Sequence, residues 1–127
     1  MLRSLSLAAL LTAALVGLPL ATATQALAHA ALVSEMPAAG TTVTASPTEL
    51  RLSFSETLEL SFSKVAVKGA DGNPVMTGTP ALDPNDAKTL IVPLTSPLPK
   101  GSVTIEWTAV SADGHKTKGS YTLTIAG

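Results

Sequence analysis

Beyond residue 28, hydrophobic and polar side chains alternate along the chain in short runs. The alternation is clearest in 103–109, where Val103, Ile105 and Trp107 are separated by polar residues. It recurs in 120–125 around Tyr121 and Leu123. A period of two is the pattern of a strand with one buried face. The pattern therefore predicts strands at 31–35, 49–55, 63–68, 89–94, 103–109 and 120–125.

Proline and glycine separate these runs. Asp71-Gly72-Asn73 predicts a turn, and Pro97, Pro99 and Gly101 mark a further connection. No segment shows the period of an amphipathic helix. Several short alternating strands divided by turn residues predict an all-β fold, either a small antiparallel β-sandwich or a Greek-key barrel.

The first 28 residues have the pattern of a secretory signal peptide. Arg3 precedes an apolar run over 5–20, and Ala26-Leu27-Ala28 forms a small-x-small cleavage site. A retained membrane helix is the alternative, but the run is short for a span. We expect a leader at 1–28 and one domain at 29–127. Cleavage after Ala23 or after Ala30 also satisfies the small-x-small rule. Cleavage after Ala23 would leave five residues before His29, and cleavage after Ala30 would remove His29.

Composition narrows the possible functions. Without Arg3, seven basic side chains remain against nine acidic ones, a formal charge of −2. No basic patch indicates nucleic-acid binding, and no second hydrophobic run indicates stable membrane insertion after processing. The chain has no cysteine, so it has neither disulfides nor a thiolate for metal binding or catalysis.

The chain has two histidines, and both stand at places that suggest a metal ion. Cleavage after Ala28 makes His29 the first residue, and its α-amine and imidazole can then chelate one ion. Asp113 and His115 are two residues apart, so an extended backbone would direct both to the same side. Nitrogen ligands favour Cu(II) among divalent ions, with Zn and Ni left open. Because the nitrogens must lose protons, affinity should fall at acid pH.

Three segments together resemble the CopC-like periplasmic copper-binding family. Residues 29–40 are similar to its opening His-x-x-Leu-x-x-x-x-Pro-x-x-Gly, and 50–56 to its Leu-x-Phe-Ser-Glu. Residues 107–119 are similar to Trp-x-x-x-Ser-x-Asp-x-His-x-x-x-Gly. The resemblance implies an Ig-like (cupredoxin-like) sandwich in the periplasm. It also implies a Cu(II) site made by His29, Asp113 and His115. Glu56 would then be a weak or outer ligand, unless it is simply a solvated carboxylate.

Methionine content departs from part of this family. Some members have a methionine-rich loop that binds Cu(I) through soft thioether sulfurs. Here the corresponding stretch, 70–89, holds only Met76, and Met36 lies near the N-terminus of the domain. We expect both to be packing residues, and therefore one Cu(II) ion and no separate Cu(I) site.

Two other functions are compatible with a small exported β-sandwich. One is an Ig-like interaction module without metal. The other is a copper-dependent polysaccharide monooxygenase, which needs a broad, often aromatic surface. The chain has only one Trp, one Tyr and two Phe. We predict a non-enzymatic copper carrier or buffer in copper homeostasis or resistance. Its partners would be a copper-transport membrane protein or other periplasmic carriers.

Overall fold

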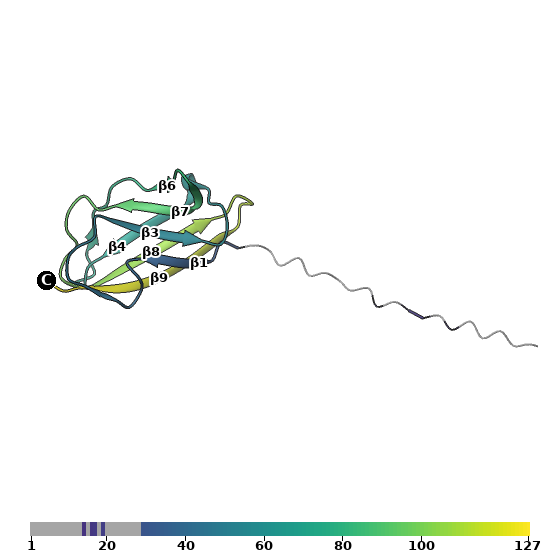
Figure 1. The fold of residues 1–127 in the computed structure, drawn as a ribbon, viewed down its shortest axis with the longest axis horizontal. Coiled ribbons are helices and arrows are strands. Elements are labelled where there is room, and N and C mark those ends of the chain that lie inside the picture. The colour runs from purple at the N-terminus through teal and green to yellow at the C-terminus, as the bar shows by residue number, and fades with distance from the viewer. Residues whose placement is uncertain (1–13, 15, 18, 20–28) are drawn as a thin grey trace, which may run out of the picture.

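The computed structural model describes residues 14, 16, 17, 19 and 29–127. The predicted leader thus falls almost entirely outside the described residues. Within 29–127, nine strands and one short 3-10 helix are packed in two layers (Figure 1). Their bounds are β1 Leu32–Met36, β2 Thr42–Val43, β3 Glu49–Phe54, η1 Leu60–Phe62, β4 Lys64–Lys68, β5 Pro74–Val75, β6 Ala81–Asp83, β7 Asp86–Pro93, β8 Gly101–Val110 and β9 Lys116–Ile125.

The two layers are a four-stranded and a five-stranded sheet. The first has the order β1-β3-β7-β6, and the second has the order β2-β9-β8-β4-β5. All pairs are antiparallel except β2 with β9, which is parallel. The described domain begins at the end of the sandwich that carries the β8–β9 turn, and the C-terminus lies at the other end (Figure 1). The residues around His29 therefore lie near the turn that holds Asp113.

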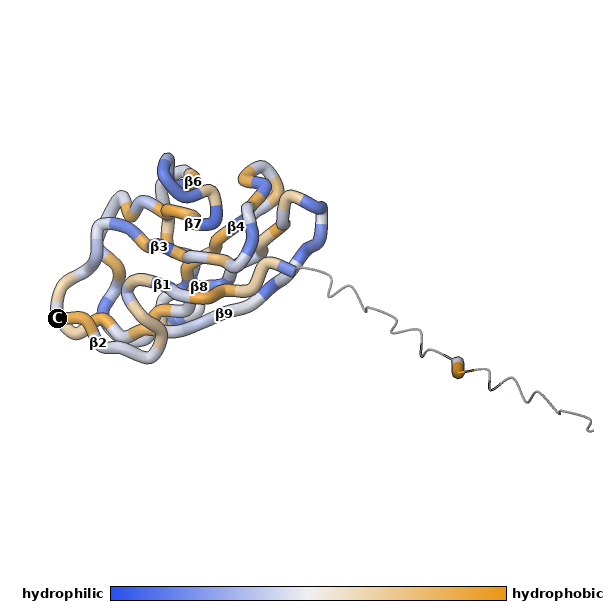
Figure 2. Tube along the Cα trace, turned by 45° about the vertical axis from the view of Figure 1, so that its right-hand side comes forward, coloured by the Kyte–Doolittle hydropathy of each residue, from blue (hydrophilic) through white to orange (hydrophobic). Residues whose placement is uncertain are grey.

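The core lies between the two sheets. In β3, Leu50, Leu52 and Phe54 are buried while their neighbours are partly exposed. In β8 and β9 the buried positions include Ile105 and Leu123, again at every second residue. Figure 2 shows the resulting changes between hydrophobic and hydrophilic colouring along the strands. Each apolar side chain removed from water contributes about 1.5–3 kcal/mol, so this alternation stabilises the sandwich without disulfides.

The predicted strands are confirmed, and the all-β sandwich is the fold. The sequence pattern did not predict β2, β5 or β6, which have only two or three residues each. It also placed the start of β9 too late, because the strand begins at Lys116 with exposed polar side chains. Polar residues at a solvated strand end carry no burial pattern, since the strand there is held by its backbone hydrogen bonds to β8.

Trp107 occupies the inner face of β8 opposite Gly119 of β9. Its indole meets the ring of Phe54 edge to face, with centroids 5.1 Å apart, and it is partly rather than fully buried. A Cβ atom at residue 119 would stand only 2.4 Å from Cζ2 of the indole. Glycine is therefore required at 119 because the indole occupies the space of a side chain.

Gly119→Ala is expected to destabilise the fold by about 1–3 kcal/mol, because the added methyl forces Trp107 out of its place. Chemical denaturation monitored by tryptophan fluorescence measures the change. Ser120→Ala, at the neighbouring exposed position, is the matched control and should shift stability by less than about 0.5 kcal/mol. Equal stability of the two variants would show that the indole adapts.

The prediction that both methionines are packing residues is wrong. Met36 is 67% exposed and Met76 is 79% exposed. Met36 ends β1 and Met76 follows β5, and these strands are edges of different sheets. Side chains at sheet edges have no neighbouring strand to cover them. Separately, none of the helical segments in the described residues has the length and apolar character needed to cross a bilayer.

Candidate metal centre

Two hydroxyl groups hold the residues that follow His29 against the sandwich. Ser55 Oγ, just after β3, donates to the His29 carbonyl oxygen at 3.2 Å and accepts from the Ala31 N–H at 2.9 Å. Thr117 Oγ1, on β9, donates to the Ala30 carbonyl oxygen at 2.7 Å. Ala30 itself is fully buried. His29 is therefore attached to both sheets at the end where β3 stops and β9 starts.

The β8–β9 connection is a tight turn of residues 111–115. The Ser111 N–H donates to the His115 carbonyl oxygen at 2.9 Å, and the Gly114 N–H donates to the Ser111 carbonyl oxygen at 2.8 Å. Gly114 has φ +88°, a conformation that L side chains rarely adopt. Asp113 and His115 thus converge through a turn, and not through the extended backbone that their spacing had suggested.

The carboxylate of Asp113 is fixed within this turn. It accepts a short hydrogen bond from Ser111 Oγ and one from the His115 N–H at 3.1 Å. The Ser111 hydroxyl, the His115 N–H and the nearby imidazole, in that order, lower the pKa of Asp113 from 3.8 to about 2. The carboxylate is therefore ionised at any pH at which a metal site of this type operates.

Ser111→Ala should raise the pKa of Asp113 back toward 3.8, because the largest cause of its lowering is removed. Since the folded-state pKa lies below the unfolded one, the ionised carboxylate stabilises the fold above about pH 4. That contribution disappears as the pH falls toward 2, so the variant should lose stability at neutral pH and not at the lowest pH. Carbon-13 NMR of the Asp113 carboxyl measures the titration. An unchanged midpoint would contradict this account.

The two histidines meet above the turn. The imidazole rings of His29 and His115 lie with centroids 5.0 Å apart and planes at 87°. His115 Nδ1 is 3.0 Å from Asp113 Oδ2, a contact that is an ion pair only when the imidazole is protonated. Nδ1 is buried and has no hydrogen-bond partner among the described residues. A nitrogen left unpartnered beside an ionised carboxylate has the donor chemistry of a metal ligand.

The distance between His115 Nδ1 and Asp113 Oδ2 is compatible with one shared ion. Two ligand atoms that each lie about 2.0–2.2 Å from a metal, with a right angle between them, are about 3 Å apart. His115 Nδ1 and Asp113 Oδ2 are separated by that distance. The side chains of His115 and Asp113 are 38% and 45% exposed, but His115 Nδ1 itself is buried.

The four predicted site residues are not all brought together. Within the described residues, no three His, Cys, Asp or Glu side chains form a group that could hold an ion. His29 approaches His115, and Asp113 approaches His115, as separate pairs. Glu56 follows Ser55 at the same end, is half-buried, and makes no hydrogen bond or ion pair with the other three among the residues described. In the uncleaved chain the nitrogen of His29 is a peptide amide, so the expected amine ligand is not yet formed.

Three further residues, which were not among the predicted site residues, build this end of the molecule. Ser55 and Thr117 anchor the N-terminal segment, and Ser111 orients Asp113. Ser111 stands within the Trp-x-x-x-Ser-x-Asp-x-His pattern, so its position was a usable signal. Ser55 is likewise the serine of the Leu-x-Phe-Ser-Glu segment, whereas Thr117 gave no signal, because a hydroxyl on an alternating strand is equally expected on a solvated face.

The domain matches known proteins over most of its length. Residues 32–126 match the CopC domain family. The chain is 43% identical over 98 residues to protein YobA of Escherichia coli strain K12, covering 77% of this chain and 79% of YobA. It is 35% identical over 115 residues to copper resistance protein C of Escherichia coli, covering 86% and 90% of the two chains.

A solved structure of a copper resistance protein also matches the domain. The chain superposes on PcoC, a methionine-rich copper resistance protein from Escherichia coli, with a TM-score of 0.68 and 35% identity. The match covers 77% of this chain and 99% of PcoC. Two of these relatives, copper resistance protein C and PcoC, are named as copper resistance proteins, and proteins of the CopC family are not enzymes, which confirms the prediction of a non-enzymatic protein related to copper. The family match begins at Leu32, so it leaves His29 untested. With 32–126 matched and the sandwich shared, the chain belongs to the CopC domain family.

Proposed function

We propose that the protein binds one Cu(II) ion through His29, Asp113 and His115 and carries or buffers it in the periplasm. The observation that supports this most strongly is the perpendicular approach of the two imidazoles at 5.0 Å beside an ionised carboxylate. Removal of residues 1–28 would add the α-amine of His29 as a third nitrogen. Three nitrogens and one carboxylate oxygen suit the tetragonal preference of Cu(II).

The protein environment would position these ligands in advance. Ser55 and Thr117 fix the segment that begins at His29, and Ser111 fixes Asp113. Such outer contacts orient metal ligands and commonly change affinity by about 10–100-fold when removed. Glu56, next to Ser55, is proposed as an outer carboxylate at the same end.

Exposure of the ligands favours a carrier or buffer over a permanent structural site. A partner can reach the exposed parts of the His115 and Asp113 side chains, although His115 Nδ1 itself is covered. The two described methionines lie at edges of different sheets, which supports a single Cu(II) site without a separate Cu(I) site. The partners we propose are a copper-transport membrane protein or other periplasmic copper carriers.

Competitive metal titration of the exported protein tests this proposal. The expected result is one bound Cu(II) that is not displaced by an equal concentration of Zn(II) or of Ni(II). Electron paramagnetic resonance should show tetragonal copper with mainly nitrogen ligands. Affinity should fall as the pH is lowered, because the nitrogen ligands become protonated. Preference for Zn(II) or Ni(II), or no metal binding at all, would refute the proposal.

A further inference from the structure

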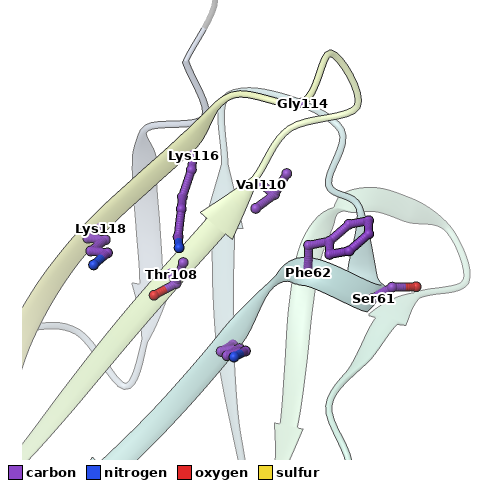
Figure 3. A pocket seen from close by; sticks show the side chains of 8 residues that line it. Ser61, Phe62, Thr108, Val110, Gly114, Lys116 and Lys118 are labelled. Atoms are coloured by element: carbon purple, nitrogen blue, oxygen red, sulfur yellow. The ribbon is translucent and has the colours of Figure 1, made fainter.

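A basic hollow lies on the outer face of the five-stranded sheet, beside the β8–β9 turn (Figure 3). It has a volume of about 720 Å³. Phe62 of η1 and Val110 of β8 supply its apolar surface, and Gly114 borders it at the turn. Three lysines contribute positive charge to the lining: Lys64 of β4 and Lys116 and Lys118 of β9. We call this surface the lysine hollow.

The strand register explains why the lysines gather. Thr108 of β8 pairs with Lys64 on one side and with Lys118 on the other, so all three lie in one row and point to the same face. Lys116 is opposite Val110, one step nearer the turn. Farther along the same face, Glu106 is paired with Lys68 at 3.2 Å. In the described part of the chain the three lysines of the hollow make no ion pair, and all three are exposed.

Phe62 is the second unusual feature of the hollow. It is 65% exposed, although the chain has only two phenylalanines and the other is buried in the core. An exposed aromatic side chain with a polar rim is typical of the anchor of a protein–protein interface. The hollow therefore offers cationic side chains and an exposed apolar surface together.

We propose that the lysine hollow binds an acidic segment of a partner protein that also presents an apolar side chain to Phe62. Charge complementarity specifies this occupant. The domain carries a formal charge of −2, and without these three lysines only four basic side chains would face nine acidic ones. A broad anionic surface such as a membrane would be repelled by the acidic side chains elsewhere on the domain. A narrow acidic segment would contact only the hollow and would be attracted by its lysines.

The hollow lies next to the turn that carries two of the proposed copper ligands. Gly114 borders the hollow and stands between Asp113 and His115 in the turn. A partner bound there would lie beside the ligands proposed for copper. The docking itself does not depend on the metal, but its use in copper exchange rests on the proposed function.

Nitrogen-15 NMR of the exported protein tests the docking. The probe is a capped octapeptide, Glu-Glu-Leu-Glu-Glu-Phe-Glu-Glu, with its lysine-for-glutamate counterpart as the control peptide. We expect saturable shifts confined to Phe62, Val110 and the three lysine positions, weakened by added salt. No saturable shift, shifts centred elsewhere, or equal binding of the lysine peptide would overturn the proposal.

Matched variants make the test specific. K64E/K118E should weaken binding of the acidic peptide about tenfold or more. K88E/K100E makes an equal charge change at exposed positions outside the hollow, and it should weaken peptide binding much less. Phe62→Ala should also weaken it, and Met76→Ala, at another exposed apolar position, should not. Equal effects within either pair would show non-specific attraction. All lie on exposed positions, and amide dispersion in the NMR spectrum verifies folding.

Two further arms distinguish the occupants and the two proposals. If the protein binds vesicles with 30 mol% phosphatidylglycerol more strongly than it binds the peptide, the occupant of the hollow is a membrane surface and the proposed protein partner is wrong. His115→Ala should lower Cu(II) affinity by about a hundredfold or more and leave the peptide shifts in place. Loss of the peptide shifts in that variant would overturn the independent docking site, whereas failure of copper binding in the unmodified protein would refute only the proposed function.

Discussion

Adding one glycine before His29 in the processed protein should lower Cu(II) affinity by about two orders of magnitude or more. The extension converts the α-amine into a peptide amide, and it separates the new amine from the imidazole. Because His29 is exposed and held through its carbonyl oxygen, the added residue should not disturb the fold. Isothermal titration of both proteins against a competing chelator measures the difference.

The matched control for this prediction is one glycine added after Gly127, which is exposed at the opposite end of the sandwich. This variant should bind copper as the unmodified protein does. If the N-terminal extension binds Cu(II) equally tightly, the chelate at the terminus is wrong, and His115 with Asp113 would have to hold the ion by other means.

His115→Ala should lower Cu(II) affinity by about a hundredfold or more while the sandwich stays folded. The variant removes Nδ1, the nitrogen that lies 3.0 Å from Asp113 Oδ2 and has no hydrogen-bond partner among the described residues. The turn itself depends on the backbone of residue 115, which accepts from Ser111 and donates to Asp113. Alanine keeps those backbone groups, so the turn should persist.

Two measurements separate a metal ligand from a structural residue. Copper affinity should fall, while the free energy of unfolding of the metal-free variant should change by less than about 0.5 kcal/mol. Glu56→Gln is the comparison variant, and an outer role for that carboxylate predicts a smaller loss of affinity. An unfolded His115→Ala protein, or one with full copper affinity, would contradict the assignment.

The sequence predicted the sandwich because most strands are long enough to alternate. Leu50, Leu52 and Phe54 define a buried face by themselves, as do the inner residues of β8 and β9. The two-residue strands β2 and β5 could not be found this way, because two residues show no period. They form where longer neighbours offer free backbone groups.

The proximity of Asp113 and His115 was predictable from their spacing, but the geometry of their contact was not. The motif indicated Asp113 and His115, but their convergence depends on a turn with Gly114 at positive φ and on the Ser111 hydroxyl. The anchoring of His29 by Ser55 and of Ala30 by Thr117 joins residues 26 and 87 positions apart, which no local pattern reveals. The exposure of Met36 and Met76 was likewise set by strand order, since sheet edges are known only once the sheets are assembled.

Native mass spectrometry of the exported protein, with and without added Cu(II), is the most direct test of the proposed N-terminal copper site. It measures the first residue and the number of bound copper ions in one experiment. The account predicts a mass that begins at His29 and gains one copper. A mass that begins at Thr24 or Ala31, or one that gains no copper, would contradict it.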